Sequence, residues 1–243
     1  MQSARFHFWS SIGKKLLTGV TGVGLMVFLV LHLAGNLNLL IGKDAFNGYT
    51  HKLEGLGELL VVVELGLLAV FLLHIVSAVS VWINNRRART VQNTVVHSKG
   101  APSRQTLSSR SMIVTGAVLL VFTVLHVLQF RFGPSVREGY VTTLGNEQVQ
   151  VRDLYRLVVE KFKQLPFVVA YMAAMVVVGV HLRHGFWSAL QSLGVLNPRL
   201  RSLAFSAGVF VAAALACGFF ILPIYLYLFA TLAGTGLALA PHP

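Results

Sequence analysis

The chain of 243 residues has little cysteine and few acidic side chains. Its single cysteine, Cys217, excludes an intramolecular disulfide, a cysteine-ligated iron–sulfur cluster and a structural zinc site. A covalent c-type haem is excluded as well, because it needs the motif C-x-x-C-H. Eight Asp and Glu residues stand against 20 Lys and Arg, so the formal net charge is +12. Such a balance indicates nucleic acid or a membrane surface as partner, depending on where the charges lie.

Long runs without charge are the main feature of the sequence. Hydrophobic residues make up 55% of the chain and the mean hydropathy is +0.71, which excludes a disordered chain and argues against a water-soluble globule. Residues 16–42, 65–85, 111–130, 164–182 and 202–243 contain no Lys, Arg, Asp or Glu. A bilayer core takes about 20 apolar residues of helix, so each run is long enough to span it. The last run has room for two spans, but Pro223 and the glycines near its end favour one long helix.

The sequence therefore predicts an all-α integral membrane protein, with one transmembrane domain over residues 1–243. The expected spanning helices cover about residues 12–40, 57–84, 109–131, 164–191 and 202–232. Residues 151–162 combine apolar positions at helical spacing with alternating charges, and they predict a short interfacial amphipathic helix.

The charges give an orientation. With five spans, one side of the membrane receives twelve basic and no acidic residues: Arg5, Lys14, Lys15, Arg86, Arg87, Arg89, Lys99, Arg104, Arg110, Arg183, Arg199 and Arg201. The positive-inside rule makes this side cytoplasmic, with the N-terminus inside and the C-terminus outside. Nucleic acid is then no longer the expected partner. Attraction to anionic lipid and the docking of a soluble protein both remain as explanations of the basic side.

Four histidines lie one each inside the first four predicted spans: His32, His74, His126 and His181. Helix direction and a rise of 1.5 Å per residue place His32 and His126 in the outer half, and His74 and His181 in the inner half. Histidines that only pack, or a proton relay, remain alternatives. Two imidazoles at one level on different helices are also the ligand set of a b-type haem without an open coordination site, which transfers electrons. Two pairs predict two such haems, stacked across the membrane.

Further residues are expected around these haems. Gly22 and Gly116 lie where a helix passes the inner haem without ligating it, and a missing Cβ gives the ring space, although ordinary helix packing also explains them. Arg110, Arg183 and His184 are expected near the propionates of the inner haem, because propionates need cationic or hydrogen-bonding partners.

Two segments resemble a known family. Residues 22–37 (GVGLMVFLVLHLAGNL) resemble the first-helix signature of the five-helix, di-haem b558-type cytochrome b subunit of succinate dehydrogenases and fumarate reductases. Residues 181–194 (HLRHGFWSALQSLG) resemble its fourth-helix signature. The resemblance covers about residues 11–194 and implies that His32 and His126 ligate the outer haem iron, and His74 and His181 the inner one. His181 is preferred to His184 because the family's ligand stands four residues before a glycine, here Gly185.

The resemblance implies a function. The chain would be the membrane anchor of respiratory complex II in the bacterial cytoplasmic membrane, as a multi-pass subunit that takes part in the tricarboxylic acid cycle. Its cytoplasmic side would dock an iron–sulfur subunit, which carries the flavoprotein subunit. Two haems b would pass electrons between these partners and a quinone, usually menaquinone. The resemblance also admits a higher oligomer of the complex.

The quinone site is expected at the outer start of the second span. Members of the family that react there with quinol use an acidic residue, and Glu54 and Glu58 both stand at this point, where a carboxylate could accept a quinol proton. Ordinary solvation of loop carboxylates is the alternative, and a proximal site near Ser10, Ser11, Lys14 and Lys15 remains open. Two other functions also remain open. They are the di-haem quinol-oxidising subunit of another respiratory complex and a haem-free transporter or scaffold.

Overall fold

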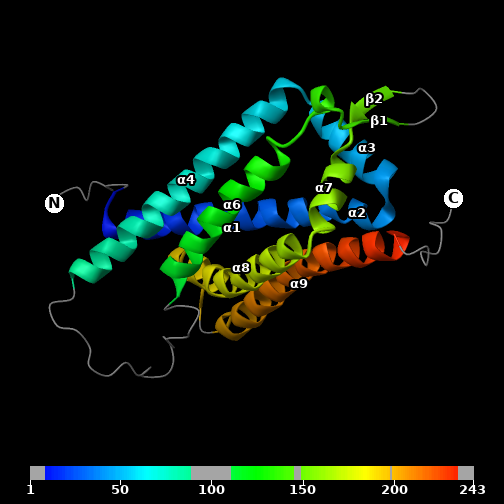
Figure 1. Cartoon of the computed structure of the whole chain (residues 1–243). Coiled ribbons are helices and arrows are strands. Elements are labelled where there is room, and N and C mark those ends of the chain that lie inside the picture. The colour runs from blue at the N-terminus through cyan, green and yellow to red at the C-terminus, as the bar shows by residue number, and fades with distance from the viewer. Residues whose placement is uncertain (1–8, 89–110, 145–148, 198, 235–243) are drawn as a thin grey trace. The chain divides into compact units, whose positions relative to one another are not determined.

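The computed structural model describes residues 9–88, 111–144, 149–197 and 199–234. In chain order its elements are α1 (Ser11–Asn36), α2 (Asn38–Ile41), α3 (Lys43–Glu54), α4 (Glu58–Arg87), α6 (Met112–Phe130), the 3-10 helix η1 (Val136–Glu138), β1 (Val141–Leu144), β2 (Val149–Arg152), α7 (Leu154–Phe162), α8 (Leu165–Ser192) and α9 (Arg201–Gly234) (Figure 1). Helices therefore make up most of this part of the chain.

Five helical segments are long and apolar enough to cross a membrane: Ser11–Ile41, Glu58–Arg87, Met112–Phe130, Leu165–Ser192 and Arg201–Ala230. The prediction of five candidate spans is confirmed, and the chain has the character of a multi-pass membrane protein. α9 continues through Pro223 as one helix, so the last uncharged run forms one span rather than two.

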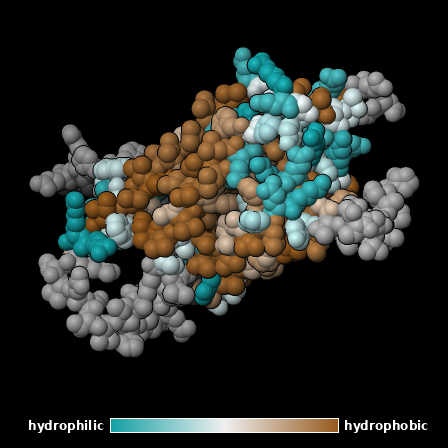
Figure 2. Space-filling model, in the orientation of Figure 1, coloured by the Kyte–Doolittle hydropathy of each residue, from teal (hydrophilic) through white to brown (hydrophobic). Residues whose placement is uncertain are grey.

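Exposed apolar side chains cover these helices. Ser77 is the buried residue of α4, whereas large apolar residues along the same helix are exposed, among them Leu59, Val62 and Leu65. Figure 2 shows hydrophobic residues gathered over the long helices and hydrophilic residues over α3 and α7. A water-soluble protein does not expose this much apolar surface, and lipid is the medium that suits it.

The chain divides into two compact units. Unit 1 consists of Met1–Phe28, Val63–Ala117 and Gly179–Ala213, and unit 2 of Leu29–Val62, Val118–Val178 and Ala214–Pro243. Each spanning helix contributes to both. In unit 1, α1 approaches α8 closely at Gly19, where a Cβ would lie 3.4 Å from the carbonyl oxygen of Ala189. Thr18 on α1 also donates to the Ser77 hydroxyl on α4 at 2.8 Å.

Unit 2 has its own apolar core. Helices α2, α3, α7, α8 and α9 supply its buried residues: Leu39, Phe46, Val158, Phe162, Val168, Tyr171, Leu222 and Leu226. One face of α7 enters this core, because Val158 and Phe162 are four residues apart and lie on the same side of the helix. The amphipathic pattern that predicted this short helix is therefore used for packing.

The predicted interfacial helix starts three residues too early. Val151 and Arg152 belong to strand β2, which pairs antiparallel with β1 in the register Val141↔Arg152. α7 begins at Leu154 because Asp153 caps it, with its carboxylate accepting from the backbone N–H of Arg156. The hairpin and helix α3 are elements that the sequence analysis does not predict.

The first predicted helix also ends earlier than expected. α1 stops at Asn36 and the short α2 follows after Leu37. Two amide side chains donate hydrogen bonds to backbone carbonyls at this break: Asn36 to the carbonyl of His32 and Asn38 to that of Gly35. Side-chain amides that bond nearby backbone groups compete with a continuing helix, which explains the interruption.

Candidate functional site

Unit 2 contains the histidine pair His32 and His126. Their ring centroids lie 5.8 Å apart, with an angle of 87° between the ring planes. Three phenylalanines surround the pair: Phe219 lies 5.7 Å from His32, and Phe122 and Phe130 lie 5.8 and 5.3 Å from His126. Two helices that are distant in sequence, α1 and α6, thus bring two imidazoles together among aromatic rings, with the amide nitrogen of Asn36 3.4 Å from Nε2 of His32.

A hydroxyl group contacts the second of these histidines. The Tyr171 oxygen lies 3.3 Å from Nδ1 of His126 and donates to Oε1 of Gln129 at 2.7 Å. Tyr171 is 9% exposed, so these are its partners in a buried place. Sequence reasoning missed Tyr171 and Gln129. A tyrosine inside an apolar span was the available hint, and no spacing ties it to His126.

Unit 1 contains the second pair, His74 on α4 and His181 on α8. The two interact electrostatically, and each has a buried threonine hydroxyl beside its ring. Oγ1 of Thr21 lies 3.2 Å from Nδ1 of His74, and Oγ1 of Thr115 lies 3.0 Å from Nδ1 of His181. The sequence analysis did not single out either threonine.

The predicted glycines lie against the same two rings. A Cβ on Gly22 would lie 3.2 Å from Cε1 of His74, and a Cβ on Gly116 would lie 3.6 Å from Cε1 of His181. The first distance is tighter than nine in ten real Cβ contacts, and the second is ordinary van der Waals contact. A methyl group at Gly22 would therefore push the His74 ring by a few tenths of an ångström, whereas Gly116 lies beside a ring that would tolerate one.

Two of the three predicted cationic partners, Arg183 and His184, lie on α8. His184 is half-buried and interacts electrostatically with His181, while Arg183 is exposed and acts on His184. Arg110 lies outside the described residues. The structure thus brings His184 toward the His74–His181 pair and leaves Arg183 at the surface.

The two predicted quinone carboxylates lie at a helix junction. Glu54 is the last residue of α3 and Glu58 the first of α4, and both are exposed. No hydrogen bond or ion pair within the described ranges joins either carboxylate to a histidine. Glu54 instead acts on Arg152, whose guanidinium donates to the carbonyls of Phe130, Gly133 and Pro134. Burial lowers the pKa of Arg152 from its ordinary value, and the charge of Glu54 offsets part of this.

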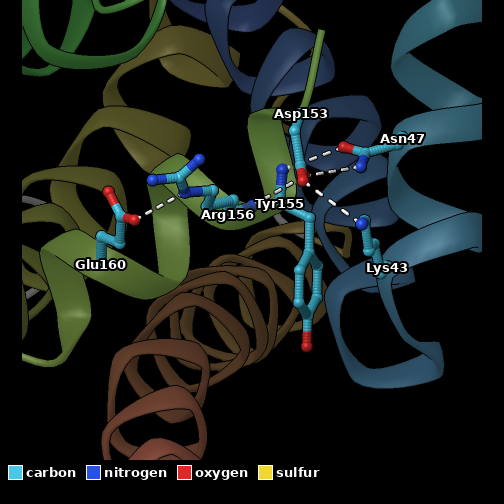
Figure 3. Close-up of polar contacts among 6 residues, drawn as sticks. All are labelled: Lys43, Asn47, Asp153, Tyr155, Arg156 and Glu160. Atoms are coloured by element: carbon cyan, nitrogen blue, oxygen red, sulfur yellow. Dashed lines mark hydrogen bonds and ion pairs between the residues drawn. The ribbon is translucent and has the colours of Figure 1, made fainter. Parts of the chain in front are cut away.

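A polar cluster ties α3 to α7 in unit 2 (Figure 3). The Asp153 carboxylate, 4% exposed, accepts from Nδ2 of Asn47 at 2.8 Å and pairs with Nζ of Lys43 at 3.4 Å. Asn47 is fully buried, and its carbonyl oxygen accepts from the backbone N–H of Tyr155 at 2.9 Å. Every polar group of Asn47 and Asp153 shown here has a partner, so the cluster fixes the approach of the two helices.

No protein family, characterised protein or solved structure that we compared with the chain matches it. Within the part of the chain that the structure describes, no group of three or more His, Cys, Asp or Glu side chains is arranged to hold a metal ion. The histidine pairs therefore offer two nitrogen ligands each and no third protein ligand of these types.

Proposed function

We propose that the chain is the di-haem cytochrome b membrane-anchor subunit of a bacterial succinate:quinone oxidoreductase. Each histidine pair would hold one haem b, His32 with His126 and His74 with His181. The resemblance of residues 22–37 and 181–194 to the family's signatures supports the proposal from the sequence. The separation of the His32 and His126 rings is the structural observation that carries it.

That separation suits two axial ligands of one metal. An imidazole binds a metal through a nitrogen about 2.0–2.1 Å away, so two imidazoles on opposite sides have centroids about 6.4 Å apart. The observed 5.8 Å between His32 and His126 is about 0.6 Å shorter than this value, so binding would need the two rings to move apart slightly. Packed aromatic rings also lie about 4.5–7 Å apart, so haem content and not this distance alone decides between ligation and packing.

The rest of the donor set also fits a haem. Two protein nitrogens leave most positions of a metal ion empty, and a porphyrin supplies the four that are missing. The phenylalanines around His32 and His126 give an apolar wall for a flat macrocycle, and Gly22 and Gly116 bring backbone close to the other pair. A bis-imidazole haem b supplies one-electron transfer when it is bound.

The charge distribution supports a cytoplasmic partner. In the described part of unit 1, basic residues at or near helix ends outnumber the single acidic residue Glu64; they are Lys14, Lys15, Arg86, Arg87, Arg183, Arg199 and Arg201. We therefore place these helix ends on the cytoplasmic side, where they would bind lipid headgroups and an acidic face of the iron–sulfur subunit. Quinone, in our proposal menaquinone, would react near Glu54 or Glu58 on the opposite side.

Haem content tests the proposal directly. We expect the purified chain to carry two haems b by the pyridine haemochrome assay, with an α-band on reduction by dithionite. His32→Ala and His126→Ala should each remove the same haem signal from a redox titration, and His74→Ala and His181→Ala the other. The exposed His51 on α3 gives the control, since His51→Ala should keep both haems. A chain without haem would sink the proposal and leave a transporter or scaffold.

The enzyme assignment needs its own test. Purification of the tagged chain from its native membrane should bring down a flavoprotein that oxidises succinate, together with an iron–sulfur protein. In that complex, Glu54→Gln or Glu58→Gln should slow quinone turnover while haem reduction by the soluble subunits continues. Co-purification with a different dehydrogenase would assign the chain to another respiratory complex.

A further inference from the structure

We propose that Thr21, Thr115 and Tyr171 are positioning residues, each of which fixes its histidine as the Nδ1–H tautomer and leaves Nε2 free to bind iron. The inference rests on the proposed function, because it assigns these residues a task toward the haem. It is carried by hydrogen-bond geometry at His74, His181 and His126. A neutral imidazole has one N–H and one lone pair, and the partner of one nitrogen decides the role of the other.

The Thr21 hydroxyl is committed as a donor to its own helix. It donates to the carbonyl of Leu17 at 2.7 Å, and a hydroxyl has one hydrogen to give. The oxygen that faces Nδ1 of His74 at 3.2 Å is therefore an acceptor, so Nδ1 carries the hydrogen.

Thr115 repeats the arrangement on α6. Its hydroxyl donates to the carbonyl of Ser111 at 3.0 Å, while its oxygen lies 3.0 Å from Nδ1 of His181. Because the single hydroxyl hydrogen of Thr115 is given to Ser111, the hydrogen between Thr115 and His181 belongs to Nδ1 of His181. Nε2 of both histidines in this pair is then unprotonated, which is the form that a metal binds.

A shared tripeptide underlies both contacts. Val20-Thr21-Gly22 on α1 and Val114-Thr115-Gly116 on α6 have the same sequence. In each, the threonine oxygen faces Nδ1 and the next residue, glycine, lies beside Cε1 of the same ring. Neither tripeptide contains a histidine, so in each case one helix contacts a candidate ligand that belongs to another helix.

At the His32–His126 pair, the phenol hydroxyl of Tyr171 takes the place of the threonine hydroxyl. Its hydroxyl donates to Oε1 of Gln129 at 2.7 Å, and its oxygen lies 3.3 Å from Nδ1 of His126. Nδ1–H of His126 therefore donates to the Tyr171 hydroxyl, which donates in turn to the side-chain carbonyl of Gln129. Three of the four candidate ligands thus have a hydroxyl oxygen beside Nδ1, which would leave Nε2 to bind iron.

The physical consequence is a stronger and better oriented ligand. An acceptor on Nδ1–H raises the electron density at Nε2 and fixes the ring plane, and losing such a partner typically costs about 10- to 100-fold in metal affinity. Higher electron density favours ferric over ferrous iron. Removing the acceptor should therefore raise the midpoint potential of the haem that the histidine ligates.

The experiment compares isosteric and hydroxyl-keeping variants of the full chain. Thr21→Val and Thr115→Val should each raise the potential of the haem assigned to His74 and His181 by up to about 59 mV, a tenfold change for a one-electron couple. They should shift its ferric EPR signal and cut its retention about tenfold. Thr21→Ser and Thr115→Ser should restore the wild-type values. Tyr171→Phe should act on the other haem alone.

Thr18→Val is the matched control. Thr18 lies on α1 and loses its hydrogen bonds to the Lys14 carbonyl and to Ser77 in this variant, and within the described residues its hydroxyl makes no hydrogen bond to an imidazole. Unchanged potential in Thr18→Val, with changed potential in Thr21→Val, supports the inference. An equal change in both, or no change in the threonine and tyrosine variants, overturns it.

A second readout does not need haem. Nitrogen-15 NMR of ring-labelled histidine in the haem-free chain reports which ring nitrogen is protonated, with His181 identified by its loss in His181→Phe. Nδ1–H supports the tautomer assignment, and Nε2–H overturns it. If the wild-type chain takes up no haem, the proposed function fails while this spectrum still decides the tautomer.

Discussion

Gly22 on α1 lies against the imidazole of His74 on α4, where a Cβ would come within 3.2 Å of Cε1. The ring occupies the space that a side chain would take. Since the neighbour is a histidine ring that Thr21 already holds by Nδ1, it has little freedom to move aside. One glycine therefore sets both the distance between two helices and the place of a candidate ligand.

We predict that Gly22→Ala weakens the haem at His74 and that Gly22→Val removes it. A methyl group forces a shift of a few tenths of an ångström, and a branched side chain does not fit, with overpacking costs of about 1–3 kcal/mol. Pyridine haemochrome should fall from two haems per chain toward one. Gly66→Val on α4 is the control, because nothing lies within 4 Å of a Cβ there. Equal haem in both variants would contradict the prediction.

Gly35 predicts a second clash, within unit 2. A Cβ at this position would lie 2.5 Å from the hydroxyl oxygen of Tyr49 and 2.6 Å from its ring. Gly35→Ala should therefore destabilise the chain by about 1–3 kcal/mol, although alanine is the better helix former by about 1 kcal/mol. Thermal unfolding in detergent should show the loss.

Two variants check the cause of that loss. Gly48→Ala on α3 has nothing within 4 Å of the new Cβ and should be neutral or stabilising. In a Tyr49→Ala background, Gly35→Ala should cost less than in the wild-type chain, because the two positions are in contact. Additive effects would show that the Tyr49 ring is not what Gly35 accommodates.

The Asp153 cluster predicts a large effect from a small change. Asn47→Ala leaves the buried carboxylate of Asp153 without its amide donor and the N–H of Tyr155 without its acceptor. Leaving buried polar groups unpaired costs about 1–3 kcal/mol each, so the unfolding midpoint should drop clearly. Lys43→Ala removes a half-exposed ion pair and should cost less than about 1 kcal/mol. Similar midpoints for the two variants would contradict the difference in burial.

Hydropathy was enough to predict the spanning helices, because a run without charges has few alternatives to crossing lipid. The single helix α9 followed from the same run. The pattern could not predict α3, whose short polar sequence is stabilised by contacts with the distant α7, as Asn47 and Asp153 show. It also could not predict the β1–β2 hairpin, whose strands have four residues each.

The candidate site was predicted in part for a similar reason. A histidine inside a span is visible as a residue type, so His32 and His126 could be named and then found together. The hydroxyl partners of His74, His126 and His181 are residue types common in membrane helices, and only the structure shows which of them face a ring. Thr21 and Thr115 stand in a repeated tripeptide, but three residues are too short a repeat to signal a shared task.

Acid should weaken the contacts of α7 with Tyr140 through Glu160. Hydrogen bonds from the Tyr140 hydroxyl and from Arg156 lower the pKa of this carboxyl below its ordinary value of 4.5. The folded state therefore binds the proton less readily than the unfolded chain. The stabilisation from Glu160 is complete above about pH 4.5 and is lost as the pH falls through the lower, folded pKa.

The variant Tyr140→Phe removes the largest cause of that shift, so its stability should fall less steeply below pH 4.5 than that of the wild-type chain. Unfolding midpoints between pH 3 and pH 7 measure the slope. Tyr155→Phe is the control, since this neighbour on α7 meets the cluster through its backbone N–H and its hydroxyl points away from the cluster (Figure 3). A slope in Tyr140→Phe equal to the wild-type slope would mean that Glu160 gains nothing from Tyr140, and that the acid sensitivity of this end arises elsewhere.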